Sequence, residues 1–170
     1  YAAENVLCAA KHYPGHGDAS QDSHKTLPII DMPFAELEKN HIYPFKKSIE
    51  HGIDMIMAAH LHCTCFDKET IPTSLSSNAL NYLRKNLNYK GVIISDDMIM
   101  NGVKQFGMNE ACILGINAGL NMFIYRDSKD MTLEVIENVI KKAEKNIDLR
   151  EKIESSYGKI KSLKDKFGIK

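Results

Sequence analysis

The chain has 170 residues, which is ample for one hydrophobic core and short for two, so we predict a single domain over residues 1–170. Apolar residues make up 44% of the chain and charged residues 26%, which is typical of a globular domain and excludes a disordered or fibrous protein. The 22 basic residues balance the 22 acidic ones, so the charge predicts no nucleic-acid partner.

Four short apolar runs predict buried strands. They cover residues 6–10, 53–59, 92–94 with its flanks, and 121–125. None of the runs alternates cleanly between apolar and polar residues, and continuous apolar strands are typical of a parallel sheet covered on both faces. The segments between the runs are long enough to supply the crossover helices.

The first two helices are predicted over residues 34–50 and 77–87. The first has an approximate apolar stripe, and Pro44 inside it predicts either a kink or the start of a second helix. In the second helix the leucines recur at helical spacing, and Ser76 or Ser77 is placed to cap its N-terminus.

Three further helices are predicted after the third strand. A short one covers residues 109–118 and ends at Gly119, and a strongly amphipathic one begins near Met131. The last starts after Asp148, whose side chain is expected to cap it. The order β-α-β-α-β-α-β-α-α gives four βα units, which fit either an open doubly wound sheet or half of an eight-stranded barrel.

Polar or ionisable residues follow each predicted strand: Lys11-His12, His60, Asp96-Asp97 and Arg126-Asp127. In parallel α/β folds the carboxyl ends of the strands meet at one edge, where binding sites are built. Loops are polar in any case, so the pattern by itself does not establish a site.

Residues 11–28, KHYPGHGDASQDSHKTLP, combine turn-forming glycines and prolines with three histidines and two aspartates. Lys11 and His12 suit hydrogen bonding to hydroxyl groups of a ligand, or they cap the mouth of the sheet. Asp22 and His24 are close enough in sequence for the carboxylate to orient the imidazole for proton transfer. The alternative is a surface Asp-x-His without a role.

Asp96 and Asp97 follow an apolar strand, which places a carboxylate at the mouth of the sheet. Such a carboxylate can act as a nucleophile, and an Asp pair can also hold a divalent cation. Because neighbouring side chains on a strand point to opposite sides, one carboxylate is expected to face the ligand and the other to hydrogen-bond the loop.

The four cysteines do not form a disulfide framework, and we expect reduced, mostly buried thiols. The run His60, His62, Cys63 and Cys65 holds residue types that bind zinc, although direct neighbours reach one tetrahedral centre poorly. We therefore predict no metal and no cofactor, and keep a zinc protein as an alternative.

KHYPGHG, then DSH, then Leu27-Pro28 closely resembles a signature of bacterial β-N-acetylglucosaminidases in glycoside hydrolase family 3. The run GVIISDDMIM at residues 91–100 is similar to their nucleophile segment, and residues 74–89 are similar to the helix before it. The resemblance covers residues 6–125. Tyr13 replaces the more frequent Phe, and Met98-Ile99 stands where related sequences often carry Leu-Ser.

This resemblance implies an α/β fold that is the C-terminal half of a TIM-type (β/α)8 barrel, with four parallel βα units and terminal helices. It implies that Asp96 is the nucleophile, that His24 is the general acid/base, and that Asp22 orients His24. Lys11 and His12 would contact the N-acetylglucosamine, and His60 lies near the site without an assigned role.

The implied activity is retaining hydrolysis of β-linked N-acetylglucosamine, with peptidoglycan fragments as the substrate. A phosphorylase is an alternative, because a histidine acid/base does not repel phosphate, and so is a non-catalytic half-barrel that binds sugars. The first four βα units of the family do not occur in these residues. We therefore expect the chain alone to be inactive and its open strand edges to favour self-association.

The apolar runs are too short to span a bilayer, and no signal peptide precedes them. The chain opens at Tyr1 without methionine, which we interpret as a cut from a longer protein. The compartment is therefore not assigned. A cytoplasmic location is favoured over a secreted or lipid-anchored form.

Overall fold

A computed structural model of the chain describes residues 4–17, 27–127 and 130–169. Its strands are β1 (Ala9–Tyr13), β2 (Ile29–Ile30), β3 (Met55–Ala58), β4 (His62–Cys63), β5 (Val92–Asp97) and β6 (Met122–Ile124). Its α-helices are α1 (Phe34–Leu37), α2 (Tyr43–Glu50), α3 (Ser77–Asn81), α4 (Asn101–Lys104), α5 (Met108–Ala118), α6 (Asp130–Lys145) and α7 (Ile147–Lys166). Two π-helical turns, η2 (Glu38–Ile42) and η4 (Tyr82–Asn86), and one 3-10 turn, η3 (Thr73–Leu75), complete the described elements.

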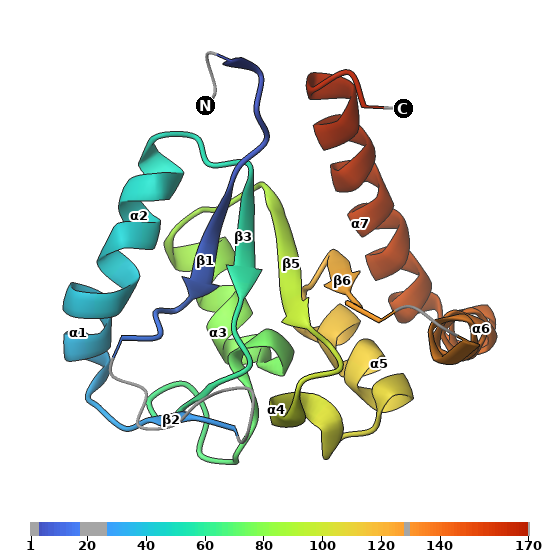
Figure 1. The fold of residues 1–170 in the computed structure, drawn as a ribbon, viewed down its shortest axis with the longest axis horizontal. Coiled ribbons are helices and arrows are strands. Elements are labelled where there is room, and N and C mark those ends of the chain that lie inside the picture. The colour runs from blue at the N-terminus through green and yellow to red at the C-terminus, as the bar shows by residue number, and fades with distance from the viewer. Residues whose placement is uncertain (1–3, 18–26, 128–129, 170) are drawn as a thin grey trace.

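The main sheet has the order β1-β3-β5-β6, and all its pairs are parallel. Helices lie along this sheet, with α1 and α2 beside β1 and with α6 and α7 beyond β6 (Figure 1). This is the architecture of half a (β/α)8 barrel, and it confirms the predicted α/β fold and its parallel strand order. The side chains of Ile56, Ala58 and Ile93 are fully buried, as strands covered by helices require.

The first strand begins three residues later than the sequence predicted. β1 covers Ala9–Tyr13 rather than residues 6–10, so Lys11 and His12 lie inside the strand and not after it. The strand extends to Tyr13 because that ring is buried and its hydroxyl donates a hydrogen bond to the carbonyl of Ala79 at 3.1 Å. The apolar run ends before the strand does, because the last residues of β1 include polar side chains near the mouth of the sheet.

The first predicted helix is confirmed, and it is divided by the turn η2. α2 begins at Tyr43, directly after η2, with Pro44 in its first turn. Ser76 caps α3 as predicted, because its hydroxyl oxygen accepts from the backbone N–H of Ala79 at 3.0 Å. The predicted cap at Asp148 is wrong. Asn146 precedes α7 and accepts from the backbone N–H of Leu149 at 3.0 Å.

The helix predicted near Met131 forms as α6, but its apolar stripe is only partly covered. Val135 is buried, whereas Leu133, Ile136 and Ile140 are 62%, 50% and 53% exposed. An apolar hollow of about 450 Å³ lies between α5, α6, α7 and the outer edge of β6. One part of the apolar stripe of α6 therefore faces α7, and the other part is left uncovered by the residues that the structure describes.

A second, two-stranded parallel ladder pairs β2 with β4. It lies beyond the carboxyl ends of β1, β3 and β5 (Figure 1). The carbonyl of Pro28 accepts from the backbone N–H of His62 at 2.8 Å. This ladder, which the sequence did not predict, fixes the chain directly after residues 18–26 at the mouth of the sheet. None of the helices in the described ranges is long and apolar enough to cross a membrane.

Candidate active site

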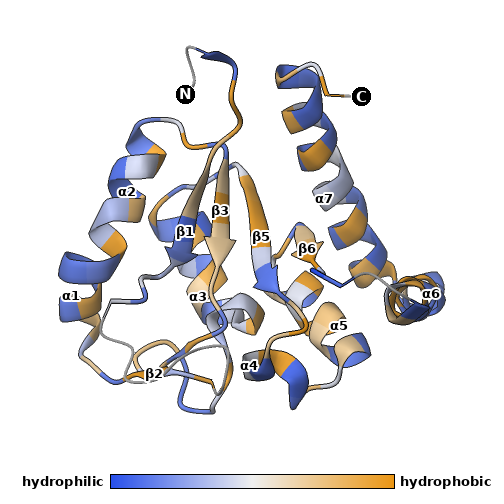
Figure 2. Ribbon diagram, viewed as in Figure 1, coloured by the Kyte–Doolittle hydropathy of each residue, from blue (hydrophilic) through white to orange (hydrophobic). Residues whose placement is uncertain are grey.

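The predicted site residues that the structure describes converge at the carboxyl ends of the main strands. His12 lies near the end of β1, His60 two residues after β3, and Asp96 and Asp97 at the end of β5. Figure 2 shows the corresponding change along β5, from hydrophobic residues to a hydrophilic tip. The predicted acid/base pair, Asp22 and His24, lies outside the described residues.

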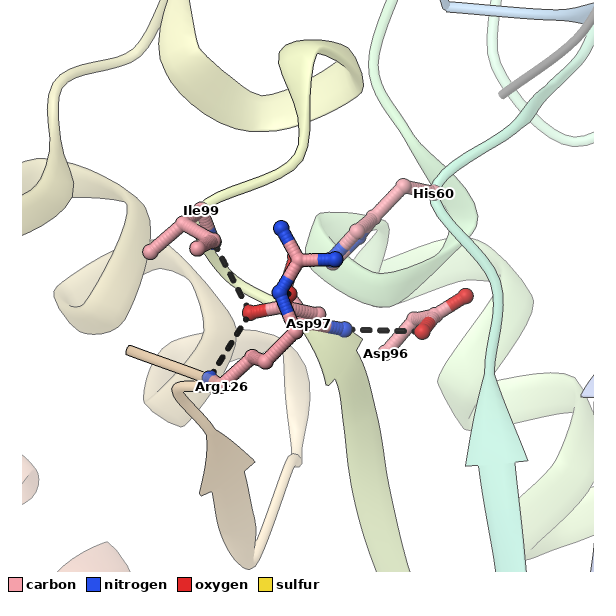
Figure 3. Close-up of polar contacts among 5 residues, drawn as sticks. All are labelled: His60, Asp96, Asp97, Ile99 and Arg126. Carbon is pink, nitrogen blue, oxygen red and sulfur yellow. Dashed lines mark hydrogen bonds and ion pairs between the residues drawn. The ribbon is translucent and has the colours of Figure 1, made fainter. Parts of the chain in front are cut away.

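Asp96 carries the more exposed carboxylate of the pair at the end of β5. Its side chain is 21% exposed, and its Oδ2 atom lies 3.8 Å from Nε2 of His12. Its other oxygen, Oδ1, accepts from the backbone N–H of Asp97 at 2.8 Å (Figure 3). The carboxylate is therefore held through one oxygen, and Oδ2 faces the space beside His12.

His12 is uncharged near neutral pH. Burial lowers the pKa of this imidazole below its usual value, and the nearby charges of Lys11 and His16 lower it further, while the carboxylate of Asp96 opposes the shift. The side chain of His12 remains 32% exposed. The imidazole can therefore donate a hydrogen bond to a neutral, hydroxyl-rich ligand or accept one from it. Lys11, on the preceding position of β1, is exposed.

The turn after β1 is fixed by close packing. The backbone N–H of Gly15 donates to the carbonyl of His12 at 2.8 Å, and the peptide bonds Lys11–His12 and Tyr13–Pro14 are cis. Gly15 has φ +130°, and a Cβ atom at this position would lie 2.8 Å from Cβ of the buried His41. Only glycine fits this turn. An open hollow of about 550 Å³ lies beside it, lined in part by His12, His16 and His41.

Asp97 hydrogen-bonds the loop, as predicted for one member of the pair. Its Oδ1 atom accepts from the backbone N–H of Ile99 at 3.3 Å and from that of Arg126 at 3.2 Å (Figure 3). Its Oδ2 atom lies 3.6 Å from Nε of Arg126, whose side chain is largely exposed. Asp97 thus joins the ends of β5 and β6, and its oxygens are already occupied by protein donors.

The residues of the zinc alternative do not converge on one centre. Nδ1 of His60 contacts the hydroxyl of Ser74 at 2.7 Å, and Nδ1 of His62 contacts the carbonyl of Ile71 at 3.0 Å. Burial raises the pKa of Cys63 to about 12, which keeps this thiol protonated and makes it a poor metal ligand. Across residues 4–17, 27–127 and 130–169, no group of three or more His, Cys, Asp or Glu side chains could hold a metal ion.

A larger hollow than the one beside β1 lies away from these residues. It has a volume of about 810 Å³ and is located at the opposite end of the sheet, between α7 and the starts of β3 and β5. Its lining includes Asp54, Lys90 and Lys166, and none of the predicted site residues. Ligands of parallel α/β folds bind at the carboxyl ends of the strands, so the candidate site is assigned to that end, where Asp96 lies 3.8 Å from His12; the 550 Å³ hollow beside β1 is lined by His12 and not by Asp96.

The sequence marked His60 as a polar residue after a strand, as a member of the zinc alternative and as a residue near the site without an assigned role, but it did not mark Ser74 or His41. The signal for His60 was its place at the strand end. Nothing in the local sequence singles out Ser74, which lies 14 residues away and is brought to His60 by the turn η3. His41 was hidden within a helix, and its role becomes visible only through its contact with Gly15.

Comparison with known proteins gives consistent results. Residues 2–163 match the family model of the glycosyl hydrolase family 3 N-terminal domain. Curated relatives named Beta-hexosaminidase include one from Nitrosomonas eutropha, 31% identical over 133 residues, and one from Glaesserella parasuis, 36% identical over 137 residues. These matches cover 77% and 79% of this chain but only 38% and 40% of the relatives. The chain therefore spans well under half the length of these relatives.

The fold is also similar to that of a glycoside hydrolase family 3 β-N-acetylglucosaminidase from Paenibacillus sp. FPU-7. The TM-score is 0.91 and the sequence identity 28%, over 98% of this chain and 32% of that protein.

Proposed function

Since the chain belongs to the family of glycosyl hydrolase family 3 N-terminal domains, we propose that it carries the catalytic centre of a retaining β-N-acetylhexosaminidase. The observation that carries this proposal is Asp96, a partly exposed carboxylate at the end of β5 with one oxygen held by the backbone and the other facing His12. The name of the similar Paenibacillus enzyme, a β-N-acetylglucosaminidase, supports N-acetylglucosamine as the sugar.

The proposed reaction proceeds in two displacements. Oδ2 of Asp96 attacks the anomeric carbon and forms a glycosyl ester, while His24 gives its proton to the leaving oxygen. Neutral His24 then takes a proton from water, whose oxygen attacks the same carbon and breaks the ester. Two inversions restore the β configuration. Asp22 orients His24 through this exchange of protons.

Lys11 and His12 are proposed to bind the sugar. Both lie on β1, where His12 is 3.8 Å from Asp96, and the uncharged His12 suits hydroxyl groups better than an anionic ligand. Peptidoglycan fragments that carry β-linked N-acetylglucosamine are the proposed natural substrate. This substrate follows from the family resemblance of the KHYPGHG and DSH motifs and is the most specific part of the proposal.

The experiment is a product analysis with the intact protein and a chromogenic β-N-acetylglucosaminide. We expect release of the aglycone and, in early NMR spectra, N-acetylglucosamine in the β configuration. A first-formed α anomer would contradict the double displacement. If the main product in phosphate buffer is the sugar 1-phosphate, the reaction is phosphorolysis and not hydrolysis. Absence of any turnover would overturn the proposal.

We further propose that the chain by itself self-associates through its outer strand edges. In the part of the chain that the structure describes, β1 and β6 each pair on one side only. Beside β6, the exposed Ile136 and Ile140 of α6 form an apolar surface next to the 450 Å³ hollow. Light scattering of residues 1–170 is expected to give a mass above that of a monomer, and Ile136→Lys to lower it. A strictly monomeric chain at high concentration would contradict this proposal.

A further inference from the structure

We propose that His60 is a positioning residue for the nucleophile, acting through the backbone of Asp97; this inference rests on the function proposed above. His60 lies two residues after β3, is 1% exposed, and uses both ring nitrogens. Nδ1 contacts the hydroxyl of Ser74 at 2.7 Å, and Nε2 contacts the carbonyl of Asp97 at 3.2 Å. Figure 3 shows its ring beside the end of β5, next to Asp96 and Asp97.

These two contacts define the tautomer of His60. The carbonyl of Asp97 can only accept, so Nε2 must carry the proton and donate it. Nδ1 of the uncharged ring then has a lone pair, which accepts the hydroxyl proton of Ser74. Burial lowers the pKa of His60, which keeps the ring uncharged and maintains this direction of donation from Ser74 to His60 to Asp97.

The Asp97 carbonyl is thereby held from two sides. It accepts from Nε2 of His60 at 3.2 Å and from the backbone N–H of Met100 at 3.0 Å. The same residue directs its backbone N–H at Oδ1 of Asp96. The N–H and the carbonyl of Asp97 belong to adjacent peptide units joined at its Cα atom, so holding the carbonyl from two sides restricts the backbone torsions there and with them the direction of the N–H. His60 thus orients the carboxylate of Asp96 without touching it.

Tight packing restricts movement of His60. A Cβ atom at Gly102 would lie 3.2 Å from both Cβ and the carbonyl oxygen of His60, so the start of α4 packs directly against this residue. The backbone N–H of Ser74 donates to the carbonyl of Ala59 at 3.1 Å, which fixes the position of the Ser74 hydroxyl relative to β3. Both partners of the ring are therefore pre-organised.

The alternative is that His60 merely fills the core, and the chain contains a matched residue that does so. His62 lies two positions later, is 3% exposed, and bonds the carbonyl of Ile71 at 3.0 Å. Ser74 likewise has a matched neighbour in Thr73, a buried hydroxyl that donates to the carbonyl of Leu61 at 3.0 Å. These neighbours make the same kinds of contact without reaching Asp97.

The test compares the variants His60→Leu, His60→Gln and His62→Leu in the intact protein, with kcat, KM and thermal stability measured for each. His60→Leu is expected to lower kcat about 100-fold with little change in KM, since a misplaced reacting group costs about this much. His60→Gln keeps a donor that can reach the Asp97 carbonyl and is expected to recover most of the kcat. His62→Leu is expected to lose stability and keep its kcat.

Ser74→Ala and Thr73→Val form the second pair. Ser74→Ala removes the group that holds Nδ1 and is expected to lower kcat about 5-fold, a smaller loss because only one of two fixing contacts is removed. Thr73→Val is expected to leave kcat within about 2-fold of the wild type, because it removes a single hydrogen bond away from Asp97.

The outcomes distinguish the positioning role of His60 from the proposed function. If the wild type turns over the substrate and His60→Leu keeps its kcat, or loses no more than His62→Leu, the positioning role is overturned and the proposed function stands. A wild type without turnover overturns the function and, with it, this inference. A loss of kcat in His60→Leu that Gln restores, at equal stability cost to His62→Leu, supports the inference.

Discussion

Replacing Asp96 by Asn is expected to lower kcat by about four orders of magnitude, which corresponds to about 5.4 kcal/mol of lost transition-state stabilisation. The amide has nearly the shape of the carboxylate but cannot form the glycosyl ester, because it lacks the negative charge and the nucleophilic oxygen. Oδ1 of Asp96 accepts from the backbone N–H of Asp97, and an amide oxygen can preserve that contact. The fold is therefore expected to survive the substitution. Steady-state kinetics with a chromogenic β-N-acetylglucosaminide measure the loss.

Asp54→Asn is the matched control for this prediction. Asp54 precedes β3 at the opposite end of the sheet, where its Oδ1 atom pairs with Nζ of Lys166 at 2.6 Å. The loss of this ion pair is expected to lower the stability of the fold and to leave kcat unchanged. A second variant, Asp96→Gly, leaves space for azide, which is expected to attack from the face opposite the leaving group and give the α-glycosyl azide. Substantial turnover by Asp96→Asn, or a kcat loss in Asp54→Asn of similar size, would sink the assignment of Asp96.

Gly15→Ala is expected to damage both the fold and the activity. The left-handed φ of +130° strains any residue with a Cβ atom, and that atom would lie 2.8 Å from Cβ and 2.9 Å from Nδ1 of His41. Backbone strain and overpacking together are expected to cost about 3 kcal/mol in the free energy of unfolding. The turn also holds the carbonyl of His12, so movement there is expected to displace the ring beside Asp96 and to lower kcat/KM about 100-fold.

Gly17→Ala is the control for the turn. Among the residues that the structure describes, and apart from its chain neighbours, a Cβ atom at Gly17 would meet no atom within 4 Å, and the backbone there is outside the left-handed region. The substitution is expected to change the free energy of unfolding by less than about 1 kcal/mol. Chemical denaturation and kinetics of both variants check the pair. Equal effects at the two positions would show that packing against His41 does not fix the turn.

Much of the fold followed from local patterns. The apolar runs predicted β3, β5 and β6, and the leucine spacing with Ser76 predicted α3, because burial on both faces leaves a direct trace in the sequence. The first strand was shifted because Lys11 and His12 interrupt the apolar run. The two-residue strands β2 and β4 were missed, since pairs of this length carry no periodicity.

The cap of α7 illustrates a different limit. Asn146 and Asp148 are both suitable N-cap residues, and their sequence positions differ by only two. The turn after α6 decides between them, because it places the side chain of Asn146 within 3.0 Å of the backbone N–H of Leu149. Similarly, the apolar stripe of α6 predicted a helix correctly but did not indicate that Ile136 and Ile140 are exposed.

The sequence by itself determined the parallel α/β order and the place of Asp96 at the end of a buried strand. Both follow from residue type and spacing along the chain. Only the tertiary structure decided which atoms meet: Oδ2 of Asp96 beside His12, Gly15 against His41, and Ser74 linked through His60 to the carbonyl of Asp97. These partners are 14 to 84 residues apart in the sequence. The sequence also does not indicate how tightly they pack. Their contacts arise because parallel strands bring distant segments to one edge.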